Sequence, residues 1–180
     1  QQESAAQRAE EALRRDRETA AQERQEAERH LRAAKSAEAS ASEREDEARR
    51  AVIPQADSFT QLTGTLPDGV VSGYAALHGG EVCGYVFTAE GKGFGGTISV
   101  LCAIGTDGKI LSVRTLDVSG ETSTLGGKTA DESYTGQYAG KDASLAGVDA
   151  VSHATITSTA YEGCVRAAFA AYESVKEAEK

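Results

Sequence analysis

The first fifty residues contain no glycine and no proline, and this constrains the chain more than any other feature. Most of them are Ala, Glu, Arg and Gln, which have high helix propensities. Four Glu–Arg pairs have i,i+4 spacing, and each contributes about 0.2–0.5 kcal/mol to a helix; they are Glu10–Arg14, Glu11–Arg15, Glu28–Arg32 and Glu45–Arg49. The pattern predicts a helix over residues 1–50, about 75 Å long at roughly 1.5 Å per residue.

A narrow stripe of small apolar residues follows this predicted helix. Ala or Leu recurs every seven residues, at positions 6, 13, 20, 27, 34, 41 and 48. A coiled coil needs a second apolar position in each heptad, but that position includes Asp16, Glu23, His30 and Arg44. We expect a solvated, charged helix or stalk; a close helix–helix contact along the stripe is the alternative.

All 19 glycines and both prolines follow residue 50, so residues 51–180 are expected to form a separate compact domain. Strand patterns cover residues 82–88, 97–104 and 109–118, with Asp107-Gly108 as a hairpin turn between the last two. The second strand is expected to be half-buried, with one apolar face formed by Ile98, Val100, Cys102 and Ile104. In the third strand, Ile110, Leu116 and Val118 are expected on one face and Leu111 and Val113 on the other.

A C-terminal amphipathic helix should complete this domain. Thr159 and Glu162 have capping-box spacing, which predicts that the helix begins at Thr159. Its apolar face recurs at three- and four-residue steps, through Tyr161, Val165, Ala168, Phe169, Tyr172 and Val175. The predicted fold class is α+β, with a mainly antiparallel sheet packed by helices.

Charge and cysteine content exclude several classes of site. The net charge is −9 and no basic stripe is present, which argues against nucleic-acid binding. The three cysteines form no CxxC pair and no His/Cys ligand spacing, so no metal site is expected. Three buried free thiols are favoured, and one disulfide with one remaining thiol is the alternative.

Small hydroxyl residues crowd the segment before the C-terminal helix, which reads Asp149-Ala-Val-Ser-His-Ala-Thr155-Ile-Thr-Ser158. Free backbone N–H groups and the helix dipole make such a place suited to a phosphate group. An ordinary N-terminal cap has the same composition, because Ser, Thr and Asp are preferred there.

The pattern Asp149-x-x-Ser152-x-Ala154-Thr155-x-Thr157-Ser158 resembles the flavinylation motif of the FMN-binding domain family. That family includes the Rnf G subunit, which this chain resembles most, and the related C subunit from the sodium-pumping NADH:quinone oxidoreductase. Three further segments resemble the family in the same order: residues 50–54, residues 84–87 with 91–96, and Glu121-Thr122-x-x-Leu125-Gly126. The resemblance implies FMN bound covalently to Thr155 through a phosphodiester, attached by a Mg-dependent flavin transferase that uses FAD.

Further flavin contacts are implied around these motifs. Those near Thr155 are Asp149, Ser152, His153, Ala154, Thr157 and Ser158, and those in the second loop are Glu121, Thr122, Leu125, Gly126 and Lys128. Asp149 would serve transferase recognition or hold the turn. Lys128 would either meet the negative side of the flavin or be solvated, and residues 91–96 are either a plain hairpin turn or a flavin-contacting turn.

Two positions depart from the family pattern. The family usually has Gly where this chain has His153, and a Gly there would serve a positive φ or a close approach to the phosphate. His153 would instead donate a hydrogen bond to the phosphodiester. Ser123 and Thr124 replace Pro and Gly of the second loop, which is therefore expected to be less rigid.

By this resemblance the chain is an electron-carrying subunit that completes no reaction alone. It would lie on the extracytoplasmic face of a membrane-bound Rnf-type complex, among other membrane subunits that couple ferredoxin:NAD electron transfer to Na⁺ or H⁺ translocation. An N-terminal membrane anchor is expected in the native protein and is absent from this sequence. The alternatives are a free-standing extracytoplasmic flavoprotein carrier and a non-redox helical scaffold or interaction module.

Overall fold

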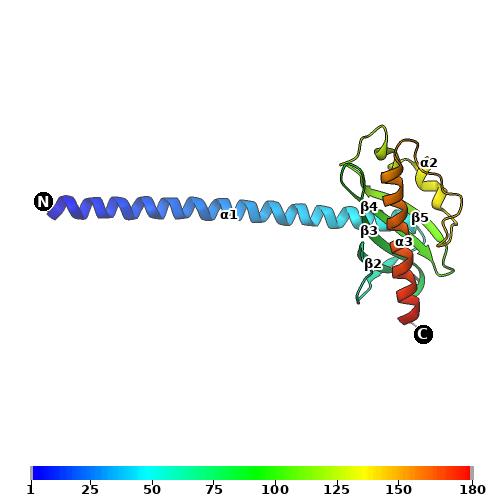
Figure 1. Ribbon diagram of the computed structural model, residues 1–180. Helices are drawn as coiled ribbons and strands as arrows, with labels where there is room; N and C mark the ends of the chain where they lie inside the picture. Colours follow the sequence, from blue (N-terminus) through cyan, green and yellow to red (C-terminus); the bar gives the residue numbers. More distant parts are fainter. Residues whose placement is uncertain (1, 179–180) are drawn as a thin grey trace. The chain divides into compact units, whose positions relative to one another are not determined.

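The structure is a computed structural model that describes residues 2–178, with side chains from residue 7 onward. It divides into two compact units, the first ending at Glu45 and the second beginning at Asp46 (Figure 1). Helix α1, Gln2–Val52, makes up the first unit and supplies the first residues of the second. The long N-terminal helix predicted from the sequence is confirmed.

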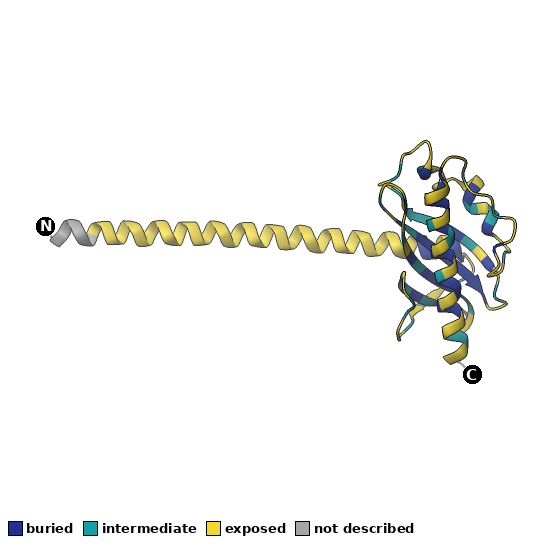
Figure 2. Ribbon diagram, in the orientation of Figure 1, coloured by how far each residue is buried: buried dark blue, intermediate teal, exposed yellow. Residues whose placement is uncertain are grey.

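Helix α1 is exposed along nearly its whole described length. Every residue from 7 to 47 is exposed, and Leu13 and Leu31 expose 51% and 56% of their surface (Figure 2). The stripe residues from position 13 to position 41 are therefore uncovered by this chain; the side chain of Ala6 lies outside the described part. None of the helices within residues 2–178 has an apolar stretch long enough to cross a lipid bilayer.

Five antiparallel strands form one sheet in the second unit, in the order of the chain. The strands are β1 Ser58–Gln61, β2 Val70–His78, β3 Glu81–Lys92, β4 Thr97–Gly105 and β5 Ile110–Asp117. The β2–β3 connection is the two-residue turn Gly79-Gly80, where both glycines have positive φ. The predicted Asp107-Gly108 turn joins β4 to β5, with Gly108 at φ +76°. The α+β class with an antiparallel sheet is confirmed.

One face of the sheet packs against helix α3, Thr155–Ala178. Short helical turns, η1 Gly126–Ala130, α2 Glu132–Thr135 and η2 Gly136–Tyr138, precede α3 and pack near β5. The shared core includes Phe87, Ile98, Val100, Cys102, Ile104, Tyr161, Val165 and Phe169. The apolar face predicted for the C-terminal helix is confirmed, because its residues from Tyr161 to Tyr172 are buried.

The end of α1 covers the opposite face of the sheet. Ala48, Val52 and Ile53 pack with a second buried cluster formed by Ala76, Val86, Leu101 and Ala103. Strand β4 is consequently buried on both faces (Figure 2). The expectation of a half-buried β4 was wrong, because the last turn of α1 and the residue that follows it supply a second layer.

The faces expected for β5 were also wrong, because two bulges interrupt its alternation. Ala103 pairs with Ser112 and Ile104 with Ile110, so Leu111 is an extra residue. A single extra residue moves every following side chain to the other face. Ile110 and Val113 therefore share the core under α3, whereas Leu116 packs in the cluster beside α1.

All three cysteines are free thiols. Cys102 and Cys164 are buried in the core beneath α3, and Cys83 is half-buried near the other face. Burial raises the pKa of the Cys164 thiol to about 11. This thiol is therefore protonated at neutral pH and packs as a small apolar side chain.

Candidate functional site

The segment predicted to carry a flavin forms the start of α3. The helix begins at Thr155 rather than at Thr159, so the prediction from the capping box was wrong by one turn. The Ala154 N–H donates to Val151 O (3.0 Å) and the Ser158 N–H donates to Ala154 O (2.9 Å), which starts the helical hydrogen bonding before Thr159. Ser158 is buried, and its Oγ accepts a hydrogen bond from the Val151 N–H at 3.0 Å.

Thr155 is the first residue of a 24-residue helix, and it is exposed. The first N–H groups of a helix have no acceptor within the helix, and the helix dipole adds partial positive charge there. Ala154 and Thr157, on either side of Thr155 in the sequence, are both buried. The Thr155 hydroxyl thus lies at an exposed helix start that is favourable for a phosphate group.

His153 takes the left-handed backbone conformation, with φ at +63°. This region is uncommon for residues with a side chain, and glycine enters it most easily. Of the two roles considered for a glycine at this position, the structure confirms the positive φ. The His153 side chain is exposed and borders the cavity described next.

A cavity of about 150 Å³ lies beside the start of α3. The β3–β4 turn, the loop before η1 and residues 153–157 form its walls, which consist of Phe94, Glu121, Thr122, Leu125, Gly126, His153, Ala154 and Thr157. Seven of these eight residues were predicted from the sequence. Phe94 was not singled out, although it lies within residues 91–96, which were considered as a flavin-contacting turn.

Glu121 connects the β3–β4 turn to α3. Its Oε1 accepts a hydrogen bond from the Gly95 N–H at 2.8 Å, and its Oε2 accepts one from Thr157 Oγ1 at 2.7 Å. Partial burial raises the pKa of this carboxyl. The hydrogen bonds from Thr157 and from the N–H groups of Gly95, Gly96 and Phe94 together lower the pKa by more than burial raises it. The pKa therefore lies below its ordinary value of 4.5, and the carboxylate form prevails at neutral pH.

Glycines allow the two loops of the site to touch through their backbones. A Cβ on Gly95 would collide with the carbonyl oxygen of Gly120, and a Cβ on Gly120 would lie 3.0 Å from the Cα of Gly96. A Cβ on Gly126 would meet both the Glu121 carboxylate and Thr157 Oγ1. Glycine is therefore required at these positions, because the two loops approach too closely for a side chain. Residues 93–96 form a hairpin turn that packs against the loop at Gly120.

The structure does not bring every predicted residue to the cavity. Asp149 and Lys128 border a separate shallow depression with Tyr134 and Gln137. The Asp149 N–H donates to Gln137 Oε1 at 2.8 Å, and Gln137 Nε2 donates to Asp149 O at 3.4 Å, so the Asp149 backbone is held in place. Ser152 is exposed on the turn before His153.

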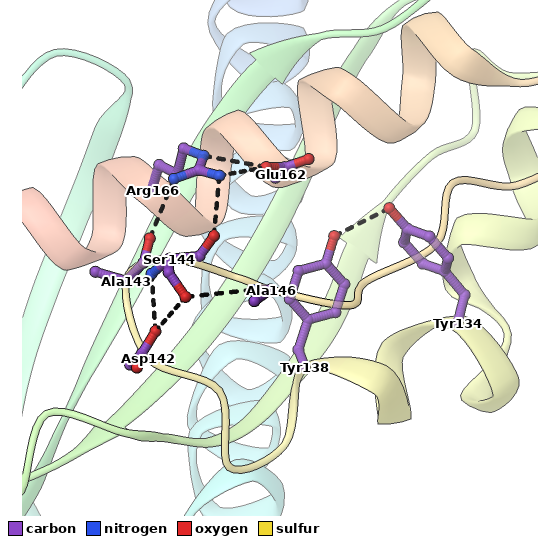
Figure 3. A network of polar contacts seen from close by, with 8 residues as sticks. All are labelled: Tyr134, Tyr138, Asp142, Ala143, Ser144, Ala146, Glu162 and Arg166. Carbon is purple, nitrogen blue, oxygen red and sulfur yellow. Dashed lines mark hydrogen bonds and ion pairs between the residues drawn. The ribbon is translucent and has the colours of Figure 1, made fainter.

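Arg166 fastens the long loop that leads to α3 onto the helix itself. Its guanidinium pairs with Glu162 and donates to the carbonyl oxygens of Ala143 (3.1 Å) and Ser144 (3.4 Å) (Figure 3). Ser144 in turn donates to Asp142 from both its N–H and its hydroxyl. These bonds restrain the chain a few residues before the motif that ends at Ser158.

Three buried tyrosines, one each from α2, η2 and α3, pack against one another. The rings of Tyr134, Tyr138 and Tyr161 lie 5.2–5.7 Å apart between centroids. The hydroxyls of Tyr134 and Tyr138 are 3.0 Å apart (Figure 3). Thr115 Oγ1 lies 3.2 Å from the Tyr161 hydroxyl and 2.9 Å from Thr129 O, which links η1 to α3. Within residues 2–178, no group of three or more His, Cys, Asp or Glu side chains is placed to hold a metal ion.

The side chains and N–H groups around the cavity are suited to a flavin, which has a phosphate group and a flat ring. Phe94, Leu125 and Ala154 give the cavity apolar walls, while the first turn of α3 supplies N–H groups for an anion. The oxygens of Glu121 already accept hydrogen bonds from the protein. Ligand pockets typically measure about 300–1,000 Å³, so this cavity would enclose part of a flavin and leave the remainder at the surface.

Residues 93–170 match the family model described as FMN-binding domain. This part of the chain is similar to FMN-binding domains. The matched region contains the cavity, the exposed Thr155 and most of α3. The family predicted from the sequence is confirmed.

Two relatives extend this finding. This chain is 31% identical over 126 residues to the G subunit from the proton-translocating ferredoxin:NAD(+) oxidoreductase complex of Clostridium ljungdahlii. The match covers 64% of this chain and 65% of that protein. It is 44% identical over 61 residues to the G subunit from the ion-translocating oxidoreductase complex of Cereibacter sphaeroides, covering 34% of this chain and 27% of that protein. The chain thus spans less than two thirds of the length of these curated relatives.

Proposed function

We propose that this protein is an electron-carrying subunit in which FMN is bound covalently to Thr155 through a phosphodiester. The observation that carries the proposal is the exposed Thr155 hydroxyl at the first residue of α3, beside an apolar-walled cavity within the FMN-binding domain. FMN supplies the capacity to take up and release electrons, and the protein sets its position and electrostatic surroundings.

Attachment is a phosphoryl-group transfer from FAD, carried out by a separate flavin transferase. Thr155 Oγ forms a bond to the phosphorus of the FMN half, and the bond from that phosphorus to the bridging oxygen of the pyrophosphate breaks. AMP leaves with the bridging oxygen, and the hydroxyl proton passes to solvent. Exposure of Thr155 supports this step, because a second protein must reach the hydroxyl.

Residues around Thr155 then hold the attached group. The first N–H groups of α3 would hold the phosphodiester, and His153, exposed on the same turn, would donate a hydrogen bond to it. Thr122, Leu125 and Gly126, which border the cavity, would contact the ring or the ribityl chain. The positions of Asp149 and Ser152 outside the cavity favour transferase recognition or support of the turn, and the position of Lys128 favours a solvated side chain.

The proposed setting is an Rnf-type complex, with the domain on the extracytoplasmic face of the membrane and other membrane subunits as partners. Both relatives are named as G subunits from oxidoreductase complexes, one described as proton-translocating and one as ion-translocating. In this setting the complex couples electron transfer between ferredoxin and NAD to the movement of Na⁺ or H⁺. Isolation from the native membrane should therefore recover the protein together with membrane subunits.

The test is intact mass after co-expression of the full chain with a flavin transferase of this system. We expect one added FMN phosphoester, yellow colour and a fluorescent gel band, all lost in Thr155→Ala. Thr159→Ala is the matched control, because this hydroxyl residue is exposed one turn after Thr155 and should leave the modification intact. A modified mass that survives Thr155→Ala would overturn the site.

A further inference from the structure

Phe94 is the most exposed of the large apolar side chains in the described residues. It exposes 76% of its surface, although a phenyl ring gains free energy when it is buried. It also borders the cavity beside α3. An aromatic side chain left in water at the edge of a cavity marks a binding surface more often than a scattered exposed residue does.

The backbone that carries Phe94 is held in place. Gly93 N–H donates to Gly96 O at 2.8 Å across the turn, and the next residue, Gly95, donates to the Glu121 carboxylate. Gly95 also packs directly on the backbone of Gly120. Because the turn is anchored on both sides, the ring is presented at a fixed place rather than on a free loop.

Apolar groups from other elements border the same cavity. Leu125, 39% exposed, comes from the loop before η1, and Ala154 comes from the turn before Thr155. A flat aromatic group entering this cavity would meet Phe94 on one of its walls. Aromatic rings that stack gain free energy beyond that from the area buried, so a flat ring is the ligand that this wall suits best.

We propose that Phe94 is the stacking platform for the isoalloxazine ring of the flavin. The inference rests on the proposed attachment at Thr155 and assigns the side chain that covers one face of the ring. Stacking of Phe94 would remove one face of the isoalloxazine ring, and the phenyl ring itself, from water. This explains why Glu121 and the glycines hold an exposed phenyl ring at this place.

The chain contains no tryptophan, which allows a specific probe. An indole in contact with a flavin quenches its fluorescence by short-range electron transfer, so Phe94→Trp introduces a single quencher at the proposed contact. Phe94→Ala removes the platform instead. Val71, 58% exposed on β2 and outside the cavity lining, gives the matched controls Val71→Trp and Val71→Ala.

The full chain is loaded by co-expression with the flavin transferase, and intact mass confirms one FMN in each variant. We expect Phe94→Trp to lose most of its flavin fluorescence. In Phe94→Ala the uncovered flavin ring should be quenched by iodide with a several-fold larger quenching constant. Both Val71 variants should match the unsubstituted protein. Unchanged iodide quenching in Phe94→Ala, with the flavin attached, overturns the role of Phe94. Absence of the FMN mass in the unsubstituted protein overturns the attachment itself, so the two failures are distinguishable.

Discussion

Residues 7–47 of α1 and the domain that begins at Asp46 are held together by different physics. The helix buries nothing in this part of the chain and depends on residue propensity and on ion pairs one turn apart, such as Arg14–Glu18 and Arg32–Glu28. The domain depends on side chains brought together from distant parts of the sequence, such as Phe87 and Phe169. Local interactions thus suffice for a helix, whereas a binding site requires packing between distant segments.

The comparison predicts its largest difference for truncation of one apolar side chain in each region. Phe87 is fully buried, so Phe87→Ala should lower the free energy of unfolding by about 3–5 kcal/mol. Leu31→Ala, on the exposed helix, should change it by no more than about 0.5 kcal/mol. Urea denaturation followed by near-ultraviolet circular dichroism measures this, because all six tyrosines follow residue 73 and report on the domain alone. A comparable loss in Leu31→Ala would mean that the helix is packed in solution and would break the comparison.

The end of α1 sharpens the comparison, because there the helix becomes part of the domain core. Ile53 follows the last turn of α1 and is fully buried against the sheet. Ile53→Ala should therefore cost about 2–5 kcal/mol of domain stability. The neighbouring Ala51 is exposed, so Ala51→Ser should stay within about 0.5 kcal/mol in the same denaturation experiment. Equally small changes in stability for Ile53→Ala and Ala51→Ser would contradict the packing of the end of α1 against the sheet.

A smaller, pH-dependent effect is expected at Glu121. Because its pKa in the folded domain lies below 4.5, the carboxylate form stabilises the domain, and this contribution is present above that pH. It is lost as the pH falls from 4.5 through the folded pKa. Glu121→Gln should therefore be less stable than the unsubstituted protein at neutral pH, and the gap should close in acid.

Denaturation midpoints between pH 7 and pH 3 measure this gap, with Glu23→Gln on the exposed helix as the control. The control should show no gap at any pH, because residue 23 lies outside the domain that the tyrosines report on. A gap at Glu121 that persists unchanged in acid would show that the carboxylate charge is not the cause.

Much of the fold could be predicted because its signals are local. A run of fifty residues without glycine or proline was enough for α1, and alternation was enough for β4. The second buried face of β4 could not be predicted, since Leu101 and Ala103 are covered by α1, about fifty residues earlier in the chain. The bulge at Leu111 was hidden for a similar reason, because register depends on the partner strand.

The candidate site shows the same division. The motif around Thr155 and the Glu121 loop were visible in the sequence, and seven of their residues do line one cavity. The sequence did not reveal that Glu121 binds Gly95 and Thr157, or that Phe94 borders the cavity, because both depend on loops that meet only in the folded domain.

The sequence by itself determined the long helix, three strands of the antiparallel sheet, the C-terminal amphipathic helix and the resemblance to the family, because propensity, alternation and motif spacing act over a few residues. It did not reveal β1 and β2. Only the tertiary structure decided which faces of the sheet are buried and which residues meet at the cavity. Those features arise from contacts between segments 25 or more residues apart, such as Gly95 with Glu121 and Glu121 with Thr157. Such contacts form only when the whole domain excludes water from its core.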